Sequence, residues 1–401
     1  MALDTNSTTD ITSWSAKYYE RAEKAQLQIA NHLRVCIDIP EDPDTLFSVA
    51  ASEPILSEAA SHIMNLRGKY NFNLPDALLN VLDSYFISPG DHSKLLVAAF
   101  FMRARDVHVH RLSVAPDQFC PIFSMNNLFC RLFQAEPFSV MSNSLPSLCR
   151  AGFSPQKFED VFRRTKVHFN HMIKQIDHEV TRRNLFAMMV RGAAAFCADG
   201  QYGFDMAYPF LYETSDLDVE KVGFILVRVK HHANPISPSA DFFKMMDPFF
   251  CDLVGENDKL DVPIIRIVFS LGEKTPSLTW QTYESPDDGA ETLDEDGRPK
   301  FTSYDFWCSG IGPDLLQPVD EYNSQEKWEK LLGGGEKDMF TDSTAPDIRR
   351  SQFPAGGTNF GHFDAWCDRE SDEDDMVDPF LVLISRPLTR GFRYKRRRLS
   401  L

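Results

Sequence analysis

The sequence predicts a protein of the α/β (α+β) class, in which a layer of helices precedes a β-sheet. Apolar residues recur at helical spacing through much of the first hundred residues, whereas the pattern after Gly200 is that of strands. The run VPIIRIVFSL over 262–271 has the length and the β-branched composition of a buried strand. Helices followed by strands are typical of an α+β or mixed α/β arrangement.

The predicted elements follow from local signals. Helices are expected over 13–34, 54–67, 75–86 and 94–105 from apolar spacing, and Pro75 suits a first helical turn. Ser154 and Pro155 are typical of a helix start, so a long helix is expected to about residue 179, followed by another over 181–198. Strands are expected over 204–212, 222–230, 262–271, 277–283, 301–308 and 380–384. Helices are expected over 238–250 and 321–332, and three glycines end the second of these.

This pattern gives an expected domain organisation. Residues 1–12 form a disordered tail, 13–180 a helical region packed on the core, 181–385 the α/β core, and 386–401 a basic tail. Two acidic loops, 285–300 and 368–378, are expected to be solvated. The cation cluster over 393–398 indicates either a nuclear-localisation or phosphate-binding patch, or a solvated terminus that balances the acidic run before it.

Composition narrows the class of protein. The 32 phenylalanines among 401 residues supply enough apolar surface for a large core, which excludes general disorder. The eight cysteines form no CxxC pair, so neither a zinc ribbon nor a dense disulfide framework is indicated. Reduced cysteines, a polar N-terminus without signal-peptide order and no membrane-length apolar run predict an intracellular protein, nuclear or cytoplasmic. The net charge of −16 argues against a broadly basic nucleic-acid binder but leaves room for a local basic groove.

The main candidate site lies on two neighbouring strands. Asp205 opens the first and Lys230 closes the second, so both are expected at one edge of the sheet. Metal-dependent phosphodiesterases use a carboxylate to hold a divalent cation and a lysine to orient the attacking water. Because side chains alternate along a strand, Arg228 should share a face with Lys230.

These residues carry a resemblance to a known family. The order helix, strand with Asp205, strand ending in Arg228-Val229-Lys230, helix, strand resembles the PD-(D/E)XK superfamily of restriction-endonuclease-like nucleases. The stretches RGAAAFCADGQYGFDMAYPFLY, VGFILVRVKHHAN and VPIIRIVFSLG resemble a group of uncharacterised proteins of mushroom-forming fungi. The resemblance covers about 71–364, most firmly 191–272. It implies a central mixed sheet of restriction-endonuclease-like type, with Asp205 and Lys230 as the superfamily's catalytic pair.

The chain departs from the family's pattern at two positions. Those fungal proteins commonly have Gln-x-Lys where this chain has Arg228, and a GELL-like helix opening falls on 93–96, where Lys94 replaces the carboxylate. One sure carboxylate, Asp205, then remains, with Glu213 as the other candidate metal ligand. A single carboxylate makes a weak Mg²⁺ site unless substrate phosphates complete it.

Two main hypotheses stay open. In the first and favoured one, the nuclease fold is degenerate and serves as a non-catalytic interaction module, with Arg228, Lys94 and His231 contacting phosphate. In the second, the protein is an active Mg²⁺-dependent endonuclease on DNA or RNA, with Asp205 and Glu213 at the metal. A third hypothesis, a relic of a mobile-element or effector-like protein, has no test in the sequence. The oligomeric state is not predicted.

A second possible site involves histidines. His168 and His171 fall at i and i+3 of the expected 154–179 helix, a spacing that can bind metal. The glutamate of an HExxH arrangement is absent, so surface or core histidines are the favoured interpretation.

Overall fold

The structure is a computed structural model of the whole chain, which divides into two units, Met1–Pro346 and Asp347–Leu401. The residues that the structure describes all lie in the first unit: 34–38, 47–50, 53–65, 72–82, 89–111, 122–175, 180–198, 201–213, 217–231, 237–321 and 324–333. The expected helix over 13–34 (apart from Arg34), the expected strand over 380–384, the acidic loop 368–378 and both predicted tails lie outside them.

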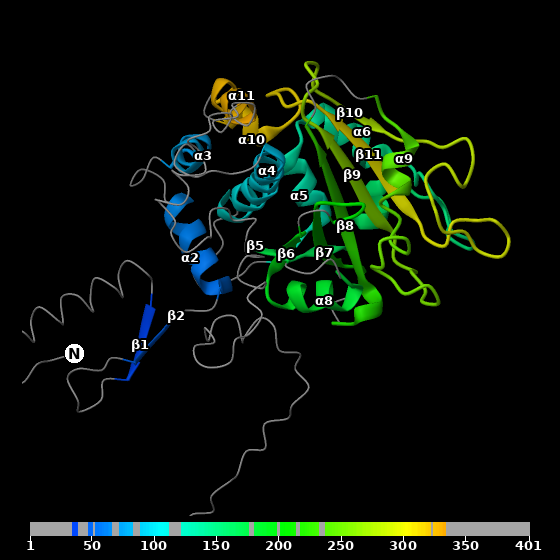
Figure 1. The fold of residues 1–401 in the computed structure, drawn as a ribbon, viewed down its shortest axis with the longest axis horizontal. Coiled ribbons are helices and arrows are strands. Elements are labelled where there is room, and N and C mark those ends of the chain that lie inside the picture. The colour runs from blue at the N-terminus through cyan, green and yellow to red at the C-terminus, as the bar shows by residue number, and fades with distance from the viewer. Residues whose placement is uncertain are drawn as a thin grey trace, which may run out of the picture. The chain divides into compact units, whose positions relative to one another are not determined.

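The N-terminal part is mostly helical, as predicted. It contains α2 (Glu53–Asn65), α3 (Leu74–Leu82) and the long α4 (Pro89–Arg111), shown in blue in Figure 1. α4 begins at Pro89, five residues earlier than expected, with proline in the first position, where no amide donor is needed. A short antiparallel pair, β1 (Arg34–Asp38) and β2 (Phe47–Ala50), was not predicted.

Within the described ranges, nine strands form the central sheet. In chain order they are β3 (Phe123–Ser124), β4 (Lys166–Val167), β5 (His171–Lys174), β6 (Ala193–Phe196), β7 (Met206–Leu211), β8 (Val222–Lys230), β9 (Ile264–Ser270), β10 (Ser277–Trp280) and β11 (Ser303–Ser309). Seven follow the order β10-β11-β9-β8-β7-β4-β3, while β6 pairs with both β5 and β7. β7 and β8 are antiparallel, and β8, β9 and β11 are parallel, so the sheet is mixed. The predicted mixed α/β fold is confirmed.

Short helices connect and cover the strands. They are α5 (Met125–Leu132), α6 (Ala135–Asn143), α7 (Phe158–Phe162), α8 (Arg182–Val190), the 3₁₀ turn η1 (Val219–Lys221), α9 (Ala240–Lys244), α10 (Gln317–Asp320) and α11 (Gln325–Gly333). α9 lies in the crossover between the parallel strands β8 and β9, as such a connection requires.

The expected long helix over 154–179 is wrong. The helix α7 ends at Phe162, and the chain then enters the sheet as β4 and β5. Buried Val167 pairs with Phe210 of β7, so sheet pairing overrides the local helical pattern. The expected helix over 181–198 is correct only for α8, because Gly192 ends it in a left-handed conformation (φ 69°) and 193–196 form β6. Strands before residue 180 therefore share the sheet with those after it.

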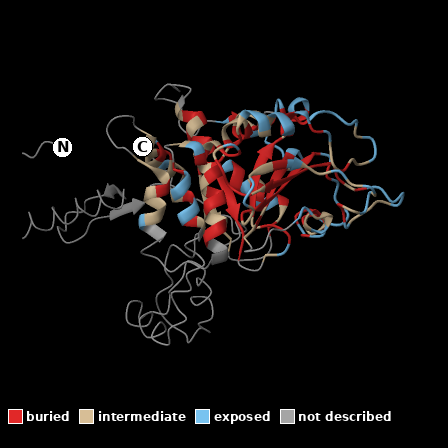
Figure 2. Ribbon diagram, turned by 90° about the horizontal axis from the view of Figure 1, so that it is seen from above, coloured by how far each residue is buried: buried red, intermediate tan, exposed pale blue. Residues whose placement is uncertain are grey.

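Both faces of the central strands are covered. Every residue of β7 and β9 is buried, which explains why 262–271 reads as a continuous apolar run. On one face, Phe101 of α4 stacks on Tyr208 with ring centroids 4.4 Å apart. On the other, Phe242 and Phe243 of α9 pack against Trp307 of β11. Figure 2 shows the buried residues concentrated in the sheet and in the helix faces against it.

One completely buried ion pair joins two neighbouring strands. Arg266 of β9 and Asp305 of β11 are both completely buried and lie 2.6 Å apart (Nη2 to Oδ2). The guanidinium also donates to the carbonyls of Phe243 and Gly289, and the Tyr283 hydroxyl donates to Asp305. Each charge thus has several hydrogen-bond partners, which offsets the cost of desolvation.

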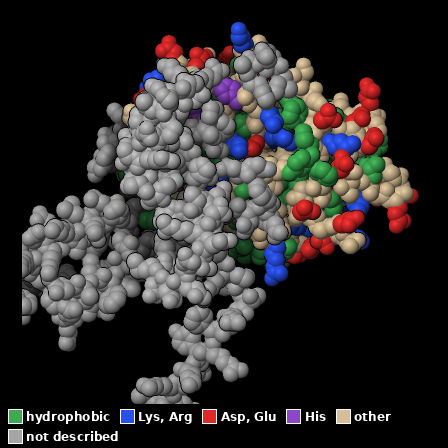
Figure 3. Space-filling model, viewed as in Figure 1, with side chains coloured by type: hydrophobic (Ala, Val, Ile, Leu, Met, Phe, Trp, Pro, Cys, Tyr) green, Lys and Arg blue, Asp and Glu red, His purple; other side chains and the backbone are tan. Residues whose placement is uncertain are grey.

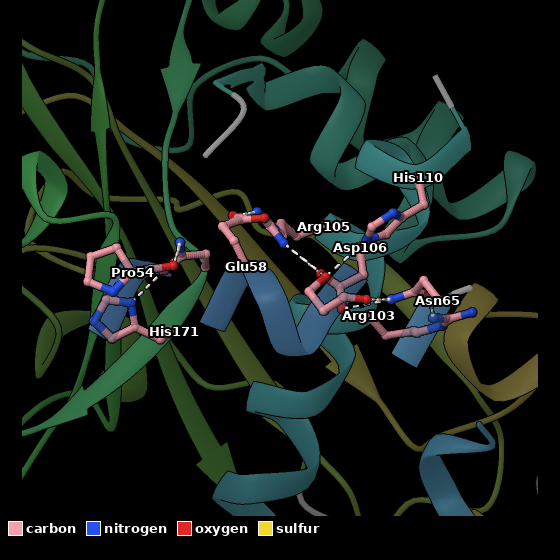
Figure 4. A network of polar contacts seen from close by, with 10 residues as sticks. Pro54, Glu58, Asn65, Arg103, Arg105, Asp106, His110 and His171 are labelled. Atoms are coloured by element: carbon pink, nitrogen blue, oxygen red, sulfur yellow. Dashed lines mark hydrogen bonds and ion pairs between the residues drawn. The ribbon is translucent and has the colours of Figure 1, made fainter. Parts of the chain in front are cut away.

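A second polar network joins α2 to α4 (Figure 4). Arg105, only 1% exposed, pairs with Glu58 of α2 and with Asp106 at 2.8 Å. Ser61 of α2 donates to Asp106 at 2.8 Å. Arg103 binds Asn65 of α2 at 2.6 Å, so α2 is held to α4 by several independent contacts.

The acidic loop over 285–300 is exposed along much of its length but is anchored. Asp247, which is completely buried, accepts hydrogen bonds from the backbone amides of Phe249 and Phe250 through one oxygen. Its other oxygen accepts from the amides of Glu291 and Thr292. One carboxylate therefore ties this loop to the segment that follows α9.

Candidate cationic site

The predicted site residues meet where β7 begins and β8 ends. Met206 of β7 pairs with Val227 of β8, which brings Asp205 level with Arg228. The Asp205 amide donates to the Val227 carbonyl at 2.8 Å, so Asp205 is still bonded to β8 although the regular pairing begins at Met206. The two strands that the sequence predicted to be neighbours are paired antiparallel, which brings Asp205, Arg228 and Lys230 to one edge of the sheet.

Asp205 is engaged through both carboxylate oxygens. Oδ2 accepts a hydrogen bond from the Val229 amide at 2.7 Å. Oδ1 lies 3.3 Å from the ammonium of Lys94, which comes from α4. The two side chains of this ion pair are only 18% and 17% exposed, so Lys94 is held close to the sheet edge.

Arg228 and Lys230 share one face of β8 and one aromatic neighbour. The Arg228 guanidinium carbon lies 5.6 Å from the ring centroid of Phe242, and the Lys230 ammonium lies 5.7 Å from it, both within range of a cation–π interaction. Arg228 Nη1 also donates to the Gly203 carbonyl at 3.0 Å. Within the part of the chain that is described, the Lys230 ammonium makes no hydrogen bond or ion pair.

Electrostatics at this edge are dominated by positive charge. We call Lys94, Arg228 and Lys230 the cationic cluster; they surround one carboxylate, Asp205. Burial, together with repulsion from Arg228 and Lys94, lowers the pKa of Lys230, and Asp205 opposes this shift. Burial also lowers the pKa of Arg228, again opposed by Asp205. Among the described residues these cations outnumber the one carboxylate beside them, so an anion would relieve their repulsion.

His231 directly follows β8 and contacts α4. Its Nδ1 lies 3.0 Å from the Ser93 hydroxyl, within hydrogen-bond distance. Burial and the proximity of His231 lower the pKa of His92, which precedes Ser93 on α4. His231 therefore lies next to Lys230 at this sheet edge, and its predicted role as a phosphate neighbour stays a prediction.

Glu213 does not join this site. It follows the far end of β7, is exposed and has a positive φ of 51°. Six residues of β7 separate it from Asp205, roughly 20 Å of strand. A metal shared by Asp205 and Glu213 is therefore geometrically excluded.

The residues at the site do not fit the Mg²⁺ that the family resemblance implies. Asp205 already bonds Val229 and Lys94, and the other charged groups given for its surroundings within the described ranges, Arg228 and Lys230, are cations. Across the described ranges, no group of three or more His, Cys, Asp or Glu side chains is arranged to hold a metal ion. A dication would face repulsion here instead of the oxygen ligands it prefers.

The two histidines of the expected helix occupy different settings. His168 follows β4, and its Nδ1 lies 3.0 Å from the Met189 carbonyl. Burial lowers the pKa of His168, with Arg105 adding to the effect and the Met189 bond opposing it. His171 opens β5 and contacts Asn170 through Nδ1. Because these histidines lie at β4 and β5 and not on a helix, the predicted helical spacing is wrong.

Two features of the site were not predicted from the sequence. Phe242 supports both cations from α9, and Ser93 bonds His231 from α4. The alternation of side chains along β8 shows which residues share the face that α9 covers. The sequence nearby does not show which aromatic side chain of α9 contacts that face. The Lys94–Asp205 pair spans 111 positions of the chain and leaves no local signal either.

Comparisons with known proteins give no family. No family model, no curated protein and no solved structure matches this chain. No helix in the described part of the chain has the length and apolarity to cross a membrane.

Proposed function

We propose that the cationic cluster binds the phosphates of a nucleic acid and that the protein does not cleave it. The observation that carries the proposal is the arrangement of Lys94, Arg228 and Lys230 around Asp205, whose two oxygens are already bonded. A phosphate would add the negative charge that this edge lacks, and arginine and lysine are the side chains that bind it best.

The strand order supports a restriction-endonuclease-like origin for this site. The elements α8, β7, β8, α9 and β9 run in the order that the resemblance implies, although the additional strand β6 lies between α8 and β7. Asp205 directly precedes β7 and Lys230 ends β8, which are the places that the resemblance implies for the catalytic pair. Arg228 and Lys94, in place of metal ligands, then convert a hydrolytic site into a binding site.

A binding and cleavage assay tests the proposal. Full-length protein would be mixed with fluorescent single- and double-stranded DNA and RNA, with Mg²⁺, with Mn²⁺ and with EDTA. We expect binding by anisotropy in all three conditions and no cleavage products. Arg228→Gln and Lys230→Met should each weaken binding about 10-fold or more, which is the usual contribution of a hydrogen bond to a charged group. Lys330→Met, an exposed site on α11, is the matched control and should bind like the wild type.

Two results would overturn the proposal. Cleavage that needs a divalent metal and disappears in both Asp205→Ala and Lys230→Ala would establish a working nuclease. Absence of binding to every strand would show that the cluster is structural.

A further inference from the structure

Two exposed aromatic side chains lie beside the cationic cluster. Tyr202 is 50% exposed and Phe250 is 43% exposed, and their ring centroids lie 5.1 Å apart at an interplanar angle of 64°. They are the aromatic members of the exposed large hydrophobic residues in the described ranges. We call them the aromatic pair. Exposed contiguous apolar surface of this kind often marks a binding site.

The aromatic pair is held by closely packed backbone. Gly203, which follows Tyr202, has a φ of 88°, and a Cβ there would lie 2.4 Å from both Cys251 Sγ and the Met245 carbonyl. Cys251, which follows Phe250, donates from its thiol to that same carbonyl at 3.0 Å. The two segments are therefore locked against each other.

Phe250 has an additional restraint. Its amide donates to the completely buried carboxylate of Asp247, which also binds the backbone of the acidic loop. Little conformational freedom of the backbone is then left to lose when a ligand packs on the rings. Such preorganisation reduces the entropic cost of binding.

Arg228 connects the aromatic pair to the cationic cluster. Its Nη1 donates to the carbonyl of Gly203 and lies 3.7 Å from the sulfur of Met245. One guanidinium thus touches both segments that carry the rings. A ligand whose phosphate binds Arg228 or Lys230 would have its next planar group near Tyr202 and Phe250.

We propose that the aromatic pair stacks unpaired nucleobases, so that the ligand of this site is single-stranded nucleic acid. The inference rests on the proposed phosphate binding by the cationic cluster. Single strands alternate phosphates and accessible base faces, and base–aromatic stacking is tolerant of sequence. In a duplex the base faces are stacked inside the helix, so the rings gain nothing from it.

Abasic strands separate stacking from phosphate binding. Full-length protein would be titrated into a fluorescent single strand, a duplex of the same sequence, and a single strand of equal length whose central nucleotides lack bases. We expect the intact strand to bind about 5- to 100-fold tighter than the abasic strand, from one stacked base. Equal affinity for intact and abasic strands, or tighter binding of the duplex, would overturn the stacking while leaving phosphate binding in place. No binding of any strand would overturn both.

Variants assign the effect to the rings. Tyr202→Ala and Phe250→Ala should reduce affinity for the intact strand by a similar factor and leave affinity for the abasic strand unchanged. Tyr202→Phe keeps the ring and should keep the affinity. Leu217→Ala is the matched control, since Leu217 is 63% exposed and lies beyond the other end of β8. Variants that lose affinity for both strands equally would contradict the assignment.

Discussion

At the scale of single residues, Lys230 is a partly buried lysine that lies close to two other cations. Its pKa is lowered from the ordinary 10.5 by burial and by Arg228 and Lys94. The folded protein therefore releases this proton at lower pH than the unfolded chain does. In the window between the folded pKa and 10.5, the contribution of Lys230 to stability rises with pH, while its contribution to anion binding falls.

This shift predicts an alkaline loss of binding. Affinity for a single-stranded oligonucleotide should fall as pH rises through the lowered Lys230 pKa, at a pH below 10.5. Lys230→Arg should keep its charge throughout and flatten the profile. Anisotropy titrations across alkaline pH measure the affinity of the wild type and of Lys230→Arg. Groups other than Lys230 titrate in both proteins, so their effect cancels in the ratio of the two affinities. Parallel profiles for the wild type and the variant would show that Lys230 does not contact the ligand.

A residue-scale prediction on stability concerns the buried ion pair of Arg266 and Asp305. Asp305→Ala leaves a completely buried guanidinium without its main partner, and should cost about 3–5 kcal/mol in the free energy of unfolding. Asp261→Ala removes the partner of Arg150, but Asp261 is 60% exposed, so that loss should stay below about 1 kcal/mol. Urea denaturation measures both; similar values for the two variants would contradict the argument.

At the scale of elements, two glycines with positive φ differ in the space that their surroundings leave for a side chain. A Cβ at Gly203 would collide with Cys251 and with the Met245 backbone, whereas a Cβ at Gly297 has nothing within 4 Å. Both alanine variants incur the cost of left-handed backbone, about 1 kcal/mol. Gly203→Ala should lose distinctly more stability than Gly297→Ala and should also weaken oligonucleotide binding, because the segments around Arg228 must separate. Equal denaturation midpoints would show that these segments are loosely packed.

The elements also show how far the sequence could predict the fold. The bounds of β8 were predicted at 222–230, as observed. The prediction succeeded because a run of apolar β-forming residues there ends in alternating apolar and charged residues. That alternation also placed Arg228 and Lys230 on one face. β5 and β6 were missed, since HMIK and AAAF are short and become strands only through their pairing with each other and with β7. The Lys94–Asp205 contact depends on how α4 packs on the sheet, which no local pattern encodes.

At the scale of the whole molecule, charge sets the conditions for binding. The chain carries a net charge of −16, and acidic and basic side chains are interspersed over the described surface in Figure 3. The three cations of the cationic cluster would therefore attract a nucleic acid that the net negative charge of the chain repels. This arrangement favours a small contact area and disfavours tracking along a duplex.

The expected salt dependence follows from the size of the cluster. Three phosphate contacts on a single strand predict a slope of about −2 for log K against log salt concentration. Lys230→Met should make the slope shallower by about 0.7. Titrations between low and moderate salt measure it, with Lys330→Met as the unchanged control. A slope several times steeper would indicate a much larger basic surface than the described residues provide.

The sheet topology has a consequence for the order of synthesis. The apolar face of α4, with Phe100 and Phe101 completely buried in the finished protein, emerges from the ribosome before the strands that cover it. β9, whose Phe269 packs on Phe101, is translated only after about 150 further residues. At about 5–20 residues per second this is roughly 10–30 s. Phe129 of α5 and Tyr208 of β7 also pack on Phe101 and emerge earlier, so the aromatic face of α4 is covered in steps and is complete only once β9 has been made.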